Sequence, residues 1–199
     1  MEKIIKKARE LLLKQGDTSF KLDIPKMRFD KRIIFDTFQN YTRLTGMSVS
    51  AFKQIKDGCT VIKGDIYIVL THALPATINS GIKRAKRINW TLAHEVGHVV
   101  LGHLRDGETE ERQANSFASE LLMPELLMLE LRLGLGRELG VNEVSRLFGV
   151  SREAALNRIG QVEQKARYSA YLKNELIEKY RYLLDDYIEK NKSKAFCDS

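Results

Sequence analysis

The chain has 199 residues, of which 43% are hydrophobic and 30% are charged. This composition is typical of a folded globular protein, and it excludes disordered and fibrous classes. No apolar stretch approaches the roughly 20 residues that a membrane-spanning helix needs, so we expect no membrane partner. The net charge of +7 leaves two interpretations open: a nucleic-acid or acidic partner, or an ordinary basic surface.

The first fifteen residues predict an amphipathic helix, because Ile4, Ala8 and Leu11 recur on one face. Basic and acidic side chains interrupt any apolar run there, which is not the pattern of a signal peptide. The two cysteines, Cys59 and Cys197, show neither a disulfide framework nor the spacing of metal ligands. These features together favour a cytoplasmic protein.

The next segments predict a small antiparallel sheet. A short apolar run at 32–38 fits either a helix or a strand, and its pattern does not decide between them. Residues from about 50 to 70 alternate in hydrophobicity, and Asp57-Gly58 and Gly64-Asp65 are turn signals between strands. Within this sheet, residues 66–70 form either an internal strand or an edge strand to which a substrate peptide could add.

Two apolar helices are expected at about 84–104 and 108–130, and Pro124 begins a new turn within the second. The last third of the chain reads as helical throughout. We therefore expect two parts, a domain over residues 1–135 and a helical extension over residues 136–199.

The extension contains a pattern that resembles a helix-turn-helix at 141–159, with Gly149 at the turn and Ser151 as the N-cap of the second helix. Such a hairpin can bind DNA, dock a repressor or pack on the rest of the protein, and its pattern does not choose among them. A long charged helix is expected from about 161 to 190. The polar side chains that the second hairpin helix could offer to DNA are Arg152, Asn157 and Arg158.

The chemistry of the chain lies in the segment His94-Glu95-Val-Gly-His98. On a helix, His94 and His98 lie one turn apart on the same face, so that both imidazoles can bind one zinc ion. Glu95 sits beside that face and can take a proton from a zinc-bound water. The alternative is a chance match in a buried helix, but the apolar residues around the motif favour a helix beneath a catalytic cleft.

A catalytic zinc site needs a third protein ligand. His103 is not expected to supply it, because on a continuous helix it would point nearly opposite His94, and we interpret it as a helix-end or packing residue. On spacing alone Glu111 is only the best of several carboxylates, with Asn115 one turn later able to hydrogen-bond a ligand and fix its orientation. The carboxylates considered are Asp106, Glu108, Glu110, Glu111 and Glu120.

Two runs carry a family resemblance, Leu92-Ala-His94-Glu95-Val-Gly-His98-Val-Val-Leu-Gly-His103 and Glu111-Arg-Gln-Ala-Asn115-Ser-Phe117-Ala-Ser-Glu-Leu-Leu-Met-Pro124. They resemble the ImmA/IrrE family of metallo-endopeptidases over about residues 65–125. The resemblance implies an α+β, zincin-like domain with a helical C-terminal extension, in which Glu111 is the third zinc ligand. Gln113 departs from the pattern, because many members carry a second Glu there.

The resemblance also implies a function, the site-specific cleavage of a partner protein. That partner is typically a helix-turn-helix repressor of a phage or mobile element, cleaved after a signal such as DNA damage. In the expected mechanism Glu95 is the general base, and Tyr67 or His72 contacts the oxyanion, with packing as the alternative role for both. Two other classes remain open, a DNA-binding regulator and a toxin–antitoxin partner, each with a non-catalytic zinc site.

Overall fold

The computed structural model describes residues 2–16, 18–52, 57–75, 82–105, 107–165 and 175–192. It has the α+β class that the sequence predicts, with helices and one small sheet. The chain forms two compact units, one of Met1–Ala8 and Asp23–Ala118 and the other of Arg9–Leu22 and Ser119–Ser199. None of the described helices has the length and apolarity that crossing a membrane requires.

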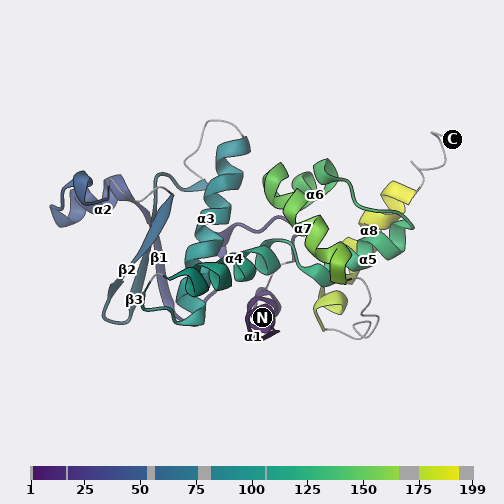
Figure 1. Cartoon of the computed structure of the whole chain (residues 1–199), viewed down its shortest axis with the longest axis horizontal. Helices are drawn as coiled ribbons and strands as arrows, with labels where there is room; N and C mark the ends of the chain where they lie inside the picture. The colour runs from purple at the N-terminus through teal and green to yellow at the C-terminus, as the bar shows by residue number, and fades with distance from the viewer. Residues whose placement is uncertain are drawn as a thin grey trace. The chain divides into compact units, whose positions relative to one another are not determined.

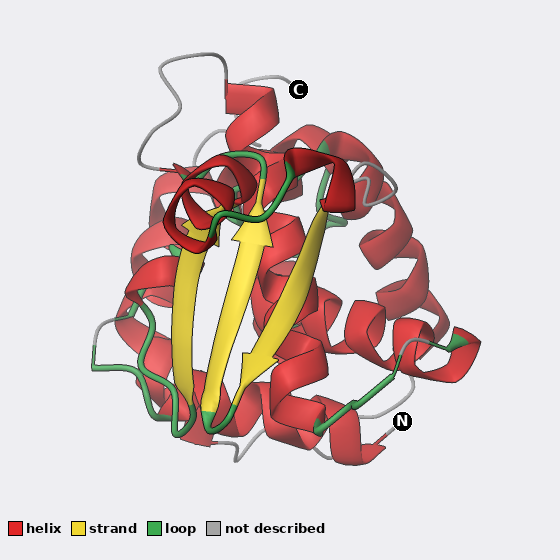
Figure 2. Cartoon of the chain, turned by 90° about the vertical axis from the view of Figure 1, so that its left-hand side faces the viewer, coloured by secondary structure: helices red, strands yellow, loops and turns green. Residues whose placement is uncertain are grey.

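The sheet of the first unit has three strands, β1 (Arg32–Thr37), β2 (Gly58–Lys63) and β3 (Ile66–Thr71), in the order β1-β3-β2. Strands β2 and β3 form the predicted antiparallel hairpin, and Gly64 supplies the positive φ of 61° in its turn. Strand β1 pairs in parallel with β3, so the sheet is mixed rather than wholly antiparallel (Figure 2). Because β3 is the middle strand, the edge-strand interpretation of residues 66–70 is wrong and the internal one is correct.

Helices contact the sheet from both sides (Figure 1), but α2 (Phe38–Thr45) covers only one end of its face (Figure 2). On this face, α2 buries Phe38 and Tyr41 against Leu70 of the middle strand. On the other face lies α3 (Ile82–Leu101), which contacts β2 and β3. The apolar run at 32–38 is therefore strand β1 followed by the first residue of α2. The alternation expected from residue 50 begins as strand only at residue 58, since Val49–Phe52 form a short 3-10 helix.

The second predicted helix is in fact two helices, α4 (Glu108–Leu122) and α5 (Glu125–Leu135). Pro124 stands at the N-cap of α5, where its missing N–H costs no helical hydrogen bond. The first turn of α4 carries three acidic side chains, which are favourable at the positive end of the helix dipole. Helix α4 is shared, since its residues to Ala118 belong to the first unit and the rest to the second.

In the second unit, α5 packs against α8 (Glu175–Lys192), and α6 (Val141–Leu147) packs against α7 (Arg152–Lys165). The predicted hairpin is confirmed, because Gly149 has a φ of 67° and the Ser151 hydroxyl accepts a hydrogen bond from the Ala154 amide at 3.1 Å. The helix expected at 161–190 is described from Glu175. Residues 161–165 prolong α7, and 166–174 lie outside the described residues.

Two groups of contacts stabilise the second unit. The ring of Phe20 contacts those of Phe148 and Tyr180, with centroids 5.6 and 6.1 Å away. Deeper in the unit, the fully buried carboxylate of Glu120 accepts hydrogen bonds from Arg158 and, at 2.7 Å, from Arg9. The amphipathic helix predicted at the N-terminus is also present, as α1 (Glu2–Leu13).

Candidate metal centre

Helix α3 carries His94, Glu95 and His98 in the first unit. Apolar side chains on both sides of them, such as Leu92 and Val96, are fully buried and hold this part of the helix against its neighbours. Because His94 and His98 are one turn apart, their rings meet on one face, with centroids 4.8 Å apart. Their Nε2 atoms lie 3.1 Å from each other.

Helix α4 approaches this face of α3 very closely at Gly97. A Cβ atom built on Gly97 would lie 3.2 Å from the Cα atom of Ala114 and 3.2 Å from the Cδ1 atom of Phe117. The missing side chain thus lets the two helices pack at close range. This contact brings Glu111 over the histidine pair, with one carboxylate oxygen 3.3 Å from His94 Nε2 and the other 3.3 Å from His98 Nε2.

The three side chains fit a single metal ion. Their ligand atoms all lie within 4.8 Å of one another, and the three specific separations are 3.1, 3.3 and 3.3 Å. Ligands bound tetrahedrally at about 2.0–2.1 Å lie about 3.3–3.4 Å apart, so little rearrangement is needed. Two imidazoles and one carboxylate are also a donor set that catalytic sites use, with one position left for water or substrate.

Asn115, on α4, contacts the outer nitrogen of His94. His94 Nδ1 lies 3.0 Å from Oδ1 of Asn115. An amide oxygen only accepts hydrogen bonds, so Nδ1 carries the proton and Nε2 keeps its lone pair on the side of Glu111. The structure therefore brings together His94, His98, Glu111 and Asn115, and their action as ligands and orienting group stays a prediction.

Glu95 is buried beside the histidine pair, with 9% of its surface exposed. The hydroxyl of Thr60, on β2, donates a hydrogen bond of 2.8 Å to Oε2 of Glu95. Thr60 was not singled out from the sequence, because the contact joins residues 35 positions apart. The bond fixes one carboxylate oxygen of Glu95.

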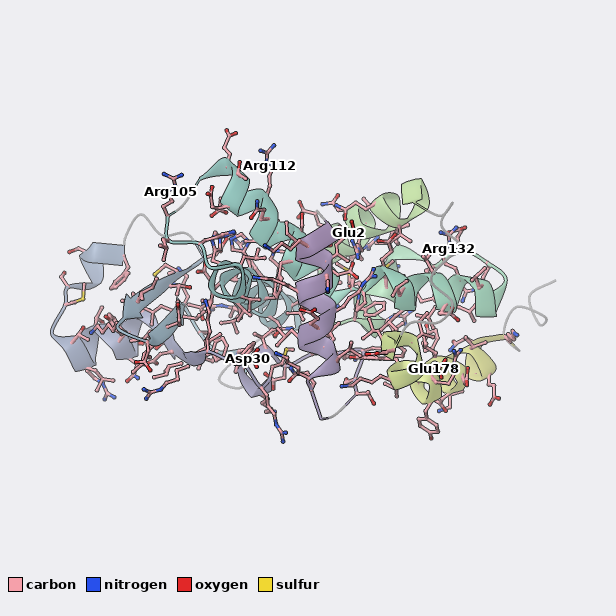
Figure 3. All side chains as sticks on the ribbon, turned by 90° about the horizontal axis from the view of Figure 1, so that it is seen from below. Glu2, Asp30, Arg105, Arg112, Arg132 and Glu178 are labelled. Carbon is pink, nitrogen blue, oxygen red and sulfur yellow. The ribbon has the colours of Figure 1, made fainter. Side chains whose placement is uncertain are left out.

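A cavity of about 530 Å³ opens over these residues. It lies between β2, β3, the start of α4 and the segment that joins α3 to α4. On its rim, Arg105 projects outward, as does Arg112 further along α4 (Figure 3). The residues that line the cavity are Asp57, Gly58, Cys59, Thr60, Ile62, Tyr67, Trp90, Thr91, His94, Glu95, His98, Val99, His103, Leu104, Arg105, Glu111 and Asn115.

The two residues named as oxyanion contacts lie in different places. Tyr67 lines the cavity, and the ammonium group of Lys31 lies 3.5 Å from its hydroxyl oxygen. His72 lies beyond the end of β3, where its ring centroid is 5.0 Å from that of Phe38 and where it lines a separate hollow beside Arg87. The structure thus brings Tyr67, but not His72, to the three candidate ligands.

His103 lies beside the cluster, contrary to the prediction that it points away. Its Nδ1 is 3.1 Å from Nδ1 of His98, and its Nε2 is 3.0 Å from Oε1 of Gln113. The prediction assumed a continuous helix, whereas α3 ends at Leu101 and Gly102 turns the chain with a φ of 80°. The amides of Gly102 and His103 then bond to the carbonyls of Val99 and His98, which folds His103 back over His98.

That turn has a signal in the sequence. A Gly four residues after His98 marks a helix end, and the residue that follows such a Gly packs against the residue five positions before it. Read this way, Gly102 places His103 against His98. His103 faces the Nδ1 of His98, whereas the Nε2 of His98 faces Glu111, so His103 is a neighbour of the candidate metal centre rather than a member.

Comparison with known proteins supports this site. Residues 77–160 match the peptidase M78 family model, described as the IrrE N-terminal-like domain. No curated protein matches the chain. The matched residues include the histidine pair, Glu95 and Glu111, and a family of this kind acts on protein substrates. Residues 77–160 thus match the same ImmA/IrrE type of metallopeptidase that the two sequence runs resemble.

Proposed function

We propose that the chain is a zinc-dependent endopeptidase that cleaves one partner protein at a specific site. The observation that carries the proposal is the arrangement of His94, His98 and Glu111, whose ligand atoms are 3.1–3.3 Å apart beside the buried carboxylate of Glu95. Three ligands with an adjacent carboxylate are typical of catalytic zinc, whereas structural zinc usually has four ligands.

In the proposed reaction each residue has one task. His94, His98 and Glu111 hold the zinc ion, which when bound lowers the pKa of a water molecule and polarises the substrate carbonyl. Glu95 accepts the proton from that water and passes it to the leaving amine. Tyr67, on the cavity wall, is the candidate for contacting the oxyanion, and the position of His72 outside the cavity argues against that role for it.

The substrate is proposed to bind along β2. Among the described strands β2 lies at one edge of the sheet, and its residues Gly58, Thr60 and Ile62 line the cavity. An extended peptide that adds to this edge would form main-chain hydrogen bonds with β2 and pass in front of Glu95. This replaces the expectation that residues 66–70 would receive the peptide.

For the partner we propose a helix-turn-helix repressor of a phage or mobile element, and for the compartment the cytoplasm, where such repressors act. Support comes from the match of residues 77–160 to the IrrE N-terminal-like domain and from the quoted ImmA/IrrE motifs.

The DNA-binding alternative is less well supported by the side chains of α7. Arg158, one of the candidate base contacts, is 4% exposed and is paired with Glu120 inside the second unit. The exposed polar residues that remain on this helix include Arg152 and Asn157, together with the unfavourable Glu153. We therefore interpret the hairpin as a packing or protein-docking element.

The test uses the full chain and its Glu95→Gln variant, with Glu108→Gln as a matched control at an exposed position on α4. Metal content and cleavage of a repressor-like protein encoded beside this chain are measured for each. We expect about one zinc per chain in all three proteins, and cleavage that falls at least about 100-fold in Glu95→Gln alone.

The possible outcomes test the general base, the metal site and the substrate class separately. Cleavage by Glu95→Gln at the wild-type rate would remove the general-base role. A wild type that takes up no zinc, or a His94→Ala variant that binds it as tightly, would remove the metal site. If zinc is bound and new N-termini appear in other proteins but not in the repressor, the peptidase stands and the substrate class is wrong.

A further inference from the structure

The two candidate histidine ligands are oriented in different ways. His94 meets an amide oxygen directly, at Asn115. The Nδ1 of His98 faces Nδ1 of His103, whose other nitrogen faces Oε1 of Gln113. We propose that Gln113 and His103 are positioning residues that fix the proton of His98 on Nδ1 and so present its Nε2 to the metal. This inference rests on the metal site proposed above.

The chain of hydrogen bonds has one consistent set of proton positions. The amide oxygen of Gln113 accepts only, so His103 must carry a proton on Nε2. In a neutral His103, Nδ1 is then bare and accepts a hydrogen bond from Nδ1–H of His98. Neutral His98 therefore has no proton on Nε2, and that lone pair points toward Glu111 and His94.

The opposite placement of the protons would prevent His98 from binding the metal. If Nδ1 of His103 carried a proton, it would donate to Nδ1 of His98 and leave the proton of a neutral His98 on Nε2. That nitrogen could not bind a metal until the proton had moved, because a ligating imidazole nitrogen must be deprotonated. By accepting a hydrogen bond from Nε2 of His103, Gln113 thus selects the first of these two proton arrangements.

The backbone holds this arrangement in place. The His103 amide donates to the His98 carbonyl at 3.0 Å, so the two rings are tied through the main chain as well as through their nitrogens. Gln113 lies on α4 between Glu111 and Asn115, and its side chain is half-buried. One helix therefore provides the carboxylate ligand and the two acceptors that set the tautomers of both histidines.

The test compares the zinc affinity of the full chain with that of Gln113→Leu, which removes the acceptor, and Gln113→Glu, which keeps it. Gln39→Leu, at an exposed position on α2, controls for the same chemical change away from the site. Affinity is measured by competition with a coloured zinc chelator. We expect a loss of about tenfold or more for Gln113→Leu, and values within about threefold of the wild type for Gln113→Glu and Gln39→Leu.

A second measurement does not depend on any variant folding. Two-bond proton–nitrogen spectra of the zinc-loaded wild type should show His103 protonated on Nε2 and bare on Nδ1, and His98 protonated on Nδ1. A proton on Nδ1 of His103 would overturn the proposal, as would Gln113→Leu binding zinc as tightly as the wild type. If instead the wild type binds no zinc, and His94→Ala behaves identically, the metal site itself has failed and this inference falls with it.

Discussion

At the scale of single residues, the candidate base is held by one hydroxyl group from another element. The Thr60 hydroxyl donates to Oε2 of Glu95, and Glu95 is almost fully enclosed. A carboxylate that can rotate spends less time in the orientation that receives a proton. We therefore predict that Thr60 contributes to catalysis by restricting Glu95, without a charge of its own.

Replacing Thr60 by Val removes the hydroxyl and keeps the shape of the side chain. A hydrogen bond to a charged group is worth about 1.5–3 kcal/mol, and 1.36 kcal/mol is about tenfold in rate. We expect kcat/KM to fall about tenfold or more in Thr60→Val, with zinc content unchanged. Thr60→Ser keeps the donor and should retain most of the activity. Equal rates for Val and Ser at this position would show that the bond has no catalytic effect.

The sequence and its family resemblance named the residues of α3 and α4 at this centre, but not the residue that β2 contributes. His94, Glu95 and His98 follow from helical spacing alone, because they lie within five residues of one another. Thr60 could not be found in this way, since it reaches Glu95 only when β2 packs on α3. His103 is the helix-end residue that was expected, but its direction was wrong because Gly102 ends a helix that the prediction took as continuous.

At the scale of elements, the end of α3 is set by Gly102. Its φ of 80° is in the left-handed region, and a Cβ atom there would meet nothing within 4 Å. A side chain at this position would therefore strain only the backbone. The same turn also folds His103 against His98, so the helix end adjoins the candidate metal centre.

We expect Gly102→Ala to lower the free energy of unfolding by about 1–2 kcal/mol, the cost of a left-handed conformation for a residue with a Cβ atom. Urea denaturation measures the loss. Gly16→Ala is a useful control, because Gly16 also has open space around it but has no positive φ. If the two substitutions had equal effects, backbone strain would not be the reason for Gly102.

The contact between α3 and α4 leads to a different expectation at Gly97. There the added methyl group meets the backbone of Ala114, which cannot rotate away. Gly97→Ala should push the helices apart, lower the free energy of unfolding by about 1–3 kcal/mol and weaken zinc binding by displacing Glu111. Chelator competition and urea denaturation report the two effects separately. Unchanged zinc affinity would show that Glu111 does not depend on this contact.

Element types were predicted better than element partners. The β2–β3 hairpin has a turn signal in its own sequence at Gly64-Asp65, and it formed as expected. The parallel pairing of β1 with β3 joins segments about thirty residues apart, such as Arg32 and Ile66, and no local pattern encodes it. For the same reason the position of β3 in the middle of the sheet was not determined from sequence.

At the scale of the whole molecule, the same limit applies to charge. The net charge of +7 and the polar residues of α7 allowed a DNA-binding interpretation, in which Arg158 was one of the contacts. In the structure this arginine is committed to Glu120, 38 positions earlier in the chain, and also donates to the Met123 carbonyl at 2.9 Å. A count of charges therefore overstates the charge that the second unit offers to a partner.

The last prediction concerns the buried carboxylate of Glu120. Removing its charge breaks the buried ion pair with Arg158 and the pair with Arg9, and breaking a buried ion pair costs about 3–5 kcal/mol. Glu120→Gln should therefore lower the free energy of unfolding by about that amount in urea denaturation. Glu178→Gln is the matched control, since Glu178 is exposed on α8 and its pair with Arg181 is worth at most about 1 kcal/mol.

A Glu120→Gln protein as stable as the control would mean that the two arginines find other partners or solvent. Arg158 would then be available to an anionic ligand after all, and the DNA-binding interpretation of α7 would regain one of its contacts. A large loss of stability would mean instead that Arg158 depends on its pair with Glu120. Because Arg158 then serves the interior of its unit, salt-dependent DNA binding by α7 would have to rely on exposed residues such as Arg152 and Asn157.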